Sequence, residues 1–211
     1  MSARSIMVIT AGLGQPSSTR LLGERLGTAT EEALRAVDVA STVRVVELRE
    51  YAHDLTNQLL TGFPSARLAE LIEQVIEADA LIAVTPIFSA SYSGLFKTFF
   101  DVLQPESLAG KPVLIAATAG TARHSLALEH ALRPLFAYLR TIVVPTAVFA
   151  ATEDWASEGG LRDRITRAAG ELAALLAPRG RERVVEPEVT PFATLLGAAN
   201  GSGPRSARVS S

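Results

Sequence analysis

The stretch ALIAVTPIFSASYSGLFKTFFD, residues 80–101, decides the fold that we expect for this sequence. Its apolar run at 80–85 is typical of a strand buried on both faces of a parallel sheet. After it come a proline, three serines and a tyrosine, and then a helix that Ser93 can cap. The apolar side of that helix is formed by Leu95, Phe96, Phe99, Phe100 and Leu103. The order of buried strand, polar loop and amphipathic helix predicts an α/β protein.

The rest of the chain repeats this alternation. Further strands are predicted at 5–10, 42–48, 112–118 and 141–149. Further helices are predicted at about 17–36, 67–78, 125–140 and 160–176. Strands that alternate with helices predict a doubly wound, five-stranded parallel sheet with helices on both faces. Pro134 falls inside one predicted helix, and we expect a bend there because proline removes a backbone hydrogen bond.

The composition favours an ordinary globular domain. The 211 residues are 48% hydrophobic and 20% charged, with a net charge of -2, so neither nucleic acid nor an acidic membrane surface is an expected partner. There is no cysteine and there are only three histidines, which makes disulfides and a metal site unexpected. We find no secretory signal and no membrane-spanning segment in the sequence, and we expect a cytoplasmic protein.

One domain is expected over residues 1–178. Residues 179–211 are expected to be a C-terminal extension. From about residue 197 this extension is rich in Gly and Ser and nearly free of large apolar residues, a composition that predicts disorder.

Three loops that follow predicted strands have an unusual composition. They are AGLGQPSSTR at 11–20, PIFSASYSG at 86–94 and AGTARHS at 119–125. In an open parallel sheet, ligands bind beyond the carboxyl ends of the strands, where the strand order reverses. We therefore expect the three loops to form one site.

The first loop favours a phosphate group. Free backbone N–H groups, the helix dipole and the hydroxyls of Ser17, Ser18 and Thr19 all attract an anion at a helix N-terminus. The alternative is that Ser17 or Ser18 only caps the helix. The loop half-matches a dinucleotide fingerprint through Gly12 and Gly14, but the third glycine is absent, so a Rossmann site is the weaker interpretation.

The other two loops suit a flat heteroaromatic ring such as a flavin. Ile87 and Phe88 offer apolar packing, while the serine hydroxyls and the backbone suit the polar edge of the ring. The alternative is a turn in which Ser93 only caps a helix. In the third loop Gly120 would let the ring approach the backbone. Arg123 and His124 either meet a phosphate of a nicotinamide dinucleotide or are ordinary surface residues.

Residues 86–97, PIFSASYSGLFK, resemble the P-x-Y/F-x-x-S-Y-S-G-x-x-K stretch of NAD(P)H-dependent FMN reductases of flavodoxin-like fold. Residues 108–113 with 118–120, and 131–135, are similar to the same family's fourth strand, glycine loop and following helix. The loop at 11–20 is most similar to reductase partners of two-component flavin-dependent monooxygenases, which include alkanesulfonate reductases. This chain has Ala11-Gly12 where the family commonly has Gly-Ser, and Gly120-Thr121 where it often has Gly-Gly.

The resemblance covers residues 4–177 and implies an FMN site. FMN phosphate is implied at Ser17, Ser18 and Thr19, and the flavin ring at Pro86, Ile87, Phe88 and Ser89. The full set of residues expected to bind the cofactor is Gly12, Ser17, Ser18, Thr19, Pro86, Ile87, Phe88, Ser89, Tyr92, Ser93, Gly94, Thr118 and Gly120. No catalytic acid or base and no metal ligand is expected.

The implied activity is hydride transfer from NADPH or NADH to FMN, with the reduced flavin supplied to a flavin-dependent monooxygenase. The cofactor carries this chemistry, so no acid-base pair is needed. Two alternatives stay open: an azo- or quinone reductase that retains its flavin, and a flavodoxin-type electron carrier without enzymatic activity. The resemblance also implies a homodimer or homotetramer, for which we expect the helix at 125–140 to provide the surface.

Overall fold

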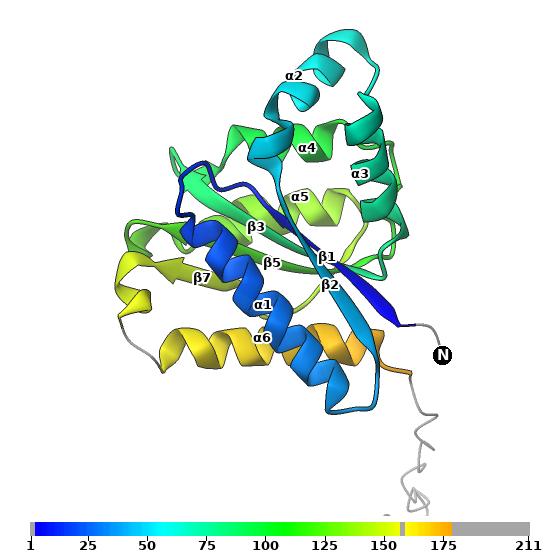
Figure 1. Cartoon of the computed structure of the whole chain (residues 1–211). Coiled ribbons are helices and arrows are strands. Elements are labelled where there is room, and N and C mark those ends of the chain that lie inside the picture. Colours follow the sequence, from blue (N-terminus) through cyan, green and yellow to red (C-terminus); the bar gives the residue numbers. More distant parts are fainter. Residues whose placement is uncertain (1–2, 157–158, 179–211) are drawn as a thin grey trace, which may run out of the picture. The chain divides into compact units, whose positions relative to one another are not determined.

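The computed structural model describes residues 3–156 and 159–178 of the chain (Figure 1). The expected extension at 179–211 therefore lies outside the described residues. None of the helices within these two ranges is both long and apolar enough to cross a membrane.

A parallel sheet forms the centre of the fold. Its strands are β1 (Arg4–Thr10), β2 (Ser41–Glu47), β3 (Ala80–Phe88), β5 (Pro112–Ala119), β6 (Ile142–Val143) and β7 (Val148–Ala151). The order is β2-β1-β3-β5, and both β6 and β7 pair with β5. These pairs are all parallel, which confirms the predicted doubly wound sheet. The strand order reverses between β1 and β3, where such sheets bind ligands.

Helices cover both faces of this sheet, as predicted. On one face lie α1 (Ser18–Arg35) and α6 (Gly160–Leu176), and on the other lie α3 (Ala66–Glu77), α4 (Gly94–Asp101) and α5 (Arg133–Tyr138) (Figure 1). Alternate residues of a strand face opposite sides. Ile6 and Val8 of β1 accordingly pack with α1 and α6, whereas Met7 and Ile9 join the core on the other face.

The strand predicted at 141–149 is wrong as a single element. It is divided into β6 and β7 because Pro145 has no N–H to donate to a neighbouring strand. The next residue, Thr146, donates its N–H and its hydroxyl to the carboxylate of Glu171 on α6 instead. The chain then returns to the sheet, and β7 continues to Ala151, two residues beyond the predicted end.

The helix predicted at 125–140 is also divided. A 3-10 turn (Ala122–His124) and a π-helical segment (Leu128–Leu132) precede α5. The N–H of Arg133 donates to the carbonyl of Leu128, five residues earlier, and Pro134 follows without an N–H. Next to Pro134, where a bend was expected, the hydrogen-bond spacing of the helix changes, and the bend itself stays a prediction.

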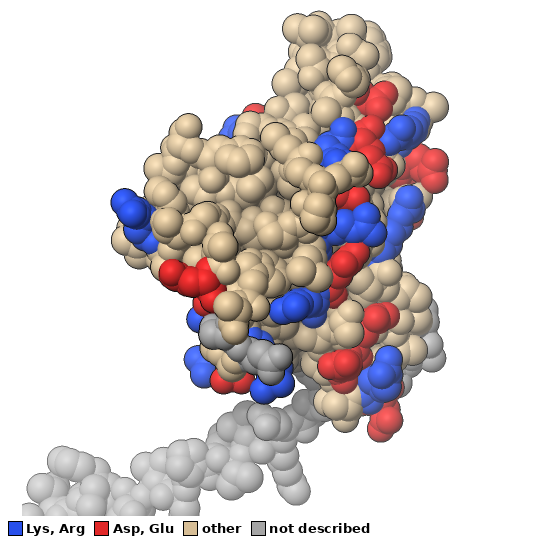
Figure 2. Space-filling model, turned by 60° about the vertical axis from the view of Figure 1, so that its left-hand side comes forward, with Lys and Arg blue, Asp and Glu red and all other residues tan. Residues whose placement is uncertain are grey.

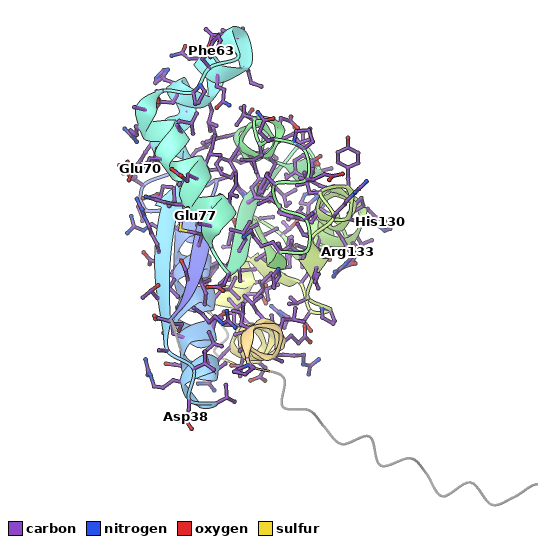
Figure 3. The ribbon with its side chains drawn as sticks, turned by 90° about the vertical axis from the view of Figure 1, so that its right-hand side faces the viewer. Asp38, Phe63, Glu70, Glu77, His130 and Arg133 are labelled. Carbon is purple, nitrogen blue, oxygen red and sulfur yellow. The ribbon has the colours of Figure 1, made fainter. Side chains whose placement is uncertain are left out.

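The sequence analysis did not predict α2 (Ala52–Thr61), which follows a 3-10 turn (Leu48–Tyr51). Leu55 is its one buried residue, so its apolar pattern is weak. Gly62 ends the helix with a φ of 81°. Phe63, which is 78% exposed, lies at the tip of the segment between α2 and α3, as Figure 3 shows.

Candidate functional site

A pocket of about 420 Å³ lies at the carboxyl ends of β1, β3, β5 and β7. Its size is within the range of small-molecule sites. The predicted site residues that line it are Gly12, Ser17, Ser18, Thr19, Pro86, Ile87, Phe88, Thr118 and Gly120. The three loops singled out in the sequence therefore meet at one pocket. Figure 2, seen from the side of these loops, shows a largely uncharged area with charged residues mainly to its sides.

The loop after β1 and the start of α1 form the first wall. Ser17 is the N-cap of α1, and its Oγ accepts a hydrogen bond of 3.1 Å from the N–H of Arg20. Ser17 therefore caps the helix and lines the pocket at the same time. A Cβ added to Gly12 would lie 2.1 Å from Ser17 Oγ and 3.0 Å from Thr19 Cβ, so a larger residue would displace the cap of α1.

The electrostatics at the start of α1 favour an anion. The first turn of an α-helix leaves N–H groups without partners inside the helix, and it carries the positive end of the helix dipole. The first turn of α1, all of which is described, contains no acidic residue that would neutralise this end. Ser18, in the same turn, is exposed and adds a hydroxyl.

Thr19 and Thr118 lie deeper in the pocket. Their side chains are buried, and the two Oγ1 atoms are 2.8 Å apart. The bond joins α1 to the end of β5. The hydroxyl of Thr19 thus has a protein partner, and its expected contact with a phosphate stays a prediction.

The end of β3 and a short strand β4 (Ser91–Tyr92) form the second wall as a hairpin. Phe88 pairs with Ser91, so Ser89 and Ala90 make a two-residue turn. Both have positive φ angles, 48° and 66°. Such turns normally contain glycine or asparagine, and strained backbone of this kind clusters at functional sites. Phe88, beside the turn, is 47% exposed and lines the pocket.

Four predicted residues lie outside this lining. Ser89 is in the turn just described. Ser93 is buried, and its Oγ caps α4 by accepting a hydrogen bond of 3.2 Å from the N–H of Phe96. Tyr92 packs against the ring of Phe96, with centroids 6.0 Å apart, and Gly94 begins α4. Their contacts with a ligand stay predictions. Arg123 and His124, in the 3-10 turn after β5, also lie outside the lining.

Two residues that line the pocket, Thr152 and Trp155, lie outside the three loops singled out in the sequence. They belong to a 3-10 turn (Thr152–Trp155) after β7. Asp154 fixes this turn, because its carboxylate accepts hydrogen bonds of 2.8 Å from the N–H of Ala151 and 2.7 Å from Arg164. Burial opposes ionisation of this carboxyl, but the two donors outweigh it and lower the pKa of Asp154. The available signal was that these residues follow a strand. The predicted strand ends at residue 149, whereas β7 continues to Ala151.

An ion-pair network braces the outer side of the first loop. Glu47, at the end of β2, accepts a bond of 2.6 Å from Arg20, which also bonds to Glu24 at 2.7 Å. Arg49 donates to the carbonyl of Leu13 at 3.5 Å. These contacts connect β2 with α1 and with the loop that lines the pocket.

The described lining consists of hydroxyl and apolar side chains together with glycine and proline. Within residues 3–156 and 159–178, no group of three or more His, Asp or Glu side chains is placed to hold a metal ion. The arrangement can hold an anionic group at α1 and a flat ring between the ends of β3 and β5.

Residues 4–156 match the family model described as NADPH-dependent FMN reductase. The chain is 34% identical over 178 residues to the FMN reductase (NADPH) of Pseudomonas aeruginosa, covering 82% of this chain and 93% of that protein. It is 36% identical over 148 residues to the NADH-dependent FMN reductase SfnF of Pseudomonas putida, covering 70% of this chain and 77% of the relative.

Solved structures give the same result. An oxidoreductase from Corynebacterium diphtheriae superposes with a TM-score of 0.81 at 47% identity, covering 84% of this chain and 99% of that one. The apo form of the NADH:FMN oxidoreductase EmoB superposes with a TM-score of 0.69 at 30% identity, covering 84% and 92%. The family model spans well over half of the sequence, and the fold of the solved relatives agrees with it. The chain belongs to the NADPH-dependent FMN reductase family.

Proposed function

We propose that this protein transfers hydride from NADPH or NADH to FMN and releases the reduced flavin to a flavin-dependent monooxygenase. Membership of the FMN reductase family supports the reductase activity. The observation that carries the proposal is that three separate loops meet at the strand-order reversal and together line one pocket.

The residues present fit FMN. The phosphate would be held by the hydroxyls of Ser17 and Ser18 and by backbone N–H groups at the start of α1, where no carboxylate competes. The close approach of Gly12 to Ser17 keeps this end of the pocket free of side-chain bulk. The flavin ring would lie against Ile87 and Phe88, with Gly120 across from them at the end of β5.

The protein's part in the reaction is positioning. Bound FMN supplies the ring that accepts hydride from the nicotinamide. The apolar and hydroxyl lining holds the two rings together and excludes water, and no proton has to be exchanged with a side chain. The bond between Thr19 and Thr118 keeps the phosphate end and the ring end of the pocket in a fixed relation.

An anaerobic assay with excess FMN tests this function. Addition of NADPH or NADH is expected to bleach many equivalents of FMN per protein, and the faster nucleotide identifies the preferred donor. Bleaching of one bound equivalent would instead indicate a flavin-retaining azo- or quinone reductase. Bound flavin that neither nucleotide bleaches would indicate an electron carrier.

The same proposal covers assembly and location. We expect a cytoplasmic homodimer or homotetramer that associates through the helical segment at 125–140, which exposes Leu126 by 64% and Tyr138 by 85%. Light scattering after size-exclusion chromatography measures the mass, and a monomer would contradict the assembly. Residues 179–211 are proposed to lie outside the flavin-binding domain, so a chain ending at 178 should keep its FMN affinity.

A further inference from the structure

A second cavity, of about 810 Å³, adjoins the flavin pocket at the start of α1. The two share Pro16, Ser17, Ser18 and Trp155 in their linings. We name the second one the α1 cavity. It extends from these shared residues along the exposed side of α1 to Glu47 at the end of β2. A ligand that reaches out of the flavin pocket past Trp155 would enter it.

A cation–π pair, Arg25 and Trp155, forms one side of the α1 cavity. The guanidinium carbon of Arg25 lies 5.1 Å from the centroid of the Trp155 ring. A guanidinium over an aromatic ring can still donate its N–H groups to an anion. Arg25 makes no ion pair within the described ranges 3–156 and 159–178, whereas Arg20 bonds to both Glu24 and Glu47. Arg25 is therefore the cation of this cavity with capacity for a phosphate.

The same cavity presents an apolar surface suited to a flat base. Leu21, in the first turn of α1, is 40% exposed and lines the cavity with Pro16 and Trp155. Half-buried tryptophan is a good platform for a heteroaromatic ring, because stacking needs no particular pattern of donors and acceptors. Aromatic, aliphatic and guanidinium groups thus occur together, as a nucleotide requires.

We propose that the α1 cavity binds the adenosine half of the nicotinamide nucleotide, with adenine against Trp155 and Leu21 and a phosphate on Arg25. This rests on the proposed function, because it places the second substrate of the hydride transfer. A dinucleotide whose nicotinamide meets the flavin must lead its other half out of the flavin pocket. The α1 cavity adjoins the flavin pocket, and its volume of about 810 Å³ exceeds the 420 Å³ of the flavin pocket.

Comparison of two hydride donors tests the proposal. NADPH carries the adenosine half, and reduced nicotinamide mononucleotide lacks it. Leu21→Ser changes a residue that lines the α1 cavity and not the flavin pocket, and it is expected to raise KM for NADPH about fivefold, to leave kcat within about twofold, and to leave KM for the mononucleotide unchanged. Leu21→Met keeps an apolar side chain and should keep most of the parent's affinity for NADPH. FMN affinity, measured by flavin fluorescence, should stay close to that of the parent in both variants.

A binding measurement without turnover tests the cation. Trp155 is the only tryptophan of the sequence and lines both cavities, so its fluorescence reports a ligand in either, and a change of Arg25, which of these two lines only the α1 cavity, distinguishes them. Titration with 2′,5′-ADP and with ADP should quench it saturably. Arg25→Gln should weaken that binding about tenfold, while Arg35→Gln, at the far end of α1, should not change it. A larger loss for 2′,5′-ADP than for ADP would assign Arg25 to the 2′-phosphate, and equal losses would assign it to the pyrophosphate.

The outcomes separate this proposal from the proposed function. If Leu21→Ser weakens FMN binding and slows both donors equally, its effect passes through the flavin and the proposal is wrong, while the reductase activity stands. If the parent reduces no FMN with either donor, the proposed function fails, and the titration with 2′,5′-ADP then decides on the cavity alone. Absence of saturable quenching overturns the nucleotide site in either case.

Discussion

The hydroxyl oxygens of Thr19 and Thr118 lie 2.8 Å apart in the flavin pocket and join two segments 99 residues apart in the sequence. One belongs to the first turn of α1, where the phosphate is proposed to bind, and the other to the end of β5, where the ring is proposed to lie. A buried hydroxyl needs a partner, so each threonine holds the other in place. The bond thereby couples the two ends of the proposed FMN site.

Replacement of one member of this pair should cost more than replacement of both. Thr118→Val keeps the shape of the side chain but leaves the Thr19 hydroxyl buried without a partner, which costs about 1–3 kcal/mol of the free energy of unfolding. The double variant Thr19→Val/Thr118→Val removes both polar groups and should be less destabilised than the sum of the single variants. Urea unfolding measures this coupling, and FMN titration should show weaker binding in each single variant.

A threonine on an exposed helix serves as the control. Thr56 in α2 donates its hydroxyl to a carbonyl of its own helix and is exposed, so Thr56→Val should stay within about 0.5 kcal/mol of the parent. If the double variant is destabilised by the full sum of the single ones, the two hydroxyls do not act as a pair.

Gly12→Ala should weaken FMN binding by about tenfold or more. The added methyl group would lie 2.1 Å from Ser17 Oγ and 3.0 Å from Thr19 Cβ, so the cap of α1 would have to move. Gly14→Ala tests the same loop with an ordinary contact, 3.4 Å from the carbonyl of Pro16, and should change affinity little. Equal losses in the two variants would mean that the loop tolerates no side chain at all, and that the clash with Ser17 is not the cause.

Ser18→Asp should reduce FMN affinity through repulsion between a carboxylate and the phosphate at the start of α1. Ser18 is exposed, so its replacement should leave folding intact. Thr28→Asp adds the same charge to an exposed position farther along α1 and is the matched control. The dissociation constant from fluorescence titration should rise in the first variant only, and more at low than at high salt, because salt screens the repulsion. Equal affinities in parent and Ser18→Asp would remove the phosphate from this position.

Elements with strong apolar periodicity were predictable from the sequence. Leu161, Ile165 and Leu172 recur at helical spacing, and α6 runs from Gly160 to Leu176 as expected. The first and third strands are continuous apolar runs and were found for the same reason. In contrast, α2 buries only Leu55 and was not predicted. The start of β7 was not predicted either, because the break before it depends on the hydrogen bond between Thr146 and Glu171, which no local pattern reveals.

The candidate site was predictable where it follows from strand ends and was missed where it depends on tertiary contacts. Because ligands bind beyond the carboxyl ends of parallel strands, the three loops were expected to form one site. The hairpin turn at Ser89 and Ala90 was missed because it lacks the glycine or asparagine that usually marks such turns. Trp155 was missed because its turn is held by Asp154 and Arg164, a contact between segments that the sequence pattern does not reveal.

Ala90→Gly should stabilise the hairpin turn. Ala90 has a φ of 66°, a region that costs an alanine about 1–2 kcal/mol and a glycine nothing. After allowance for the greater chain entropy of glycine, we expect a net gain of about 0.5–1 kcal/mol in the free energy of unfolding. Ala156→Gly, at an exposed residue with a φ of -88°, should give no gain. Thermal unfolding decides, and a lower Tm for Ala90→Gly than for the parent would show that the turn is not strained.

The 3-10 turn that carries Trp155 should become less stable in acid. The pKa of Asp154 is lowered in the folded protein, so its contribution to stability is complete at neutral pH, above the ordinary carboxyl value, and is lost as the pH falls through the folded value. Asp154→Asn keeps an oxygen for the N–H of Ala151 but removes the charge that faces Arg164. The parent should therefore be more stable than Asp154→Asn at pH 7, and the difference should shrink on acidification.

Glu153→Gln is the matched control for this pH dependence, because it removes an exposed carboxylate from the same turn. Its free energy of unfolding should follow that of the parent at each pH. Because Asp154 positions the turn, Asp154→Asn should also change the fluorescence of Trp155 at neutral pH, whereas Glu153→Gln should not. A stability difference between parent and Asp154→Asn that stays constant from neutral to acid would mean that the ionised carboxylate does not hold this turn.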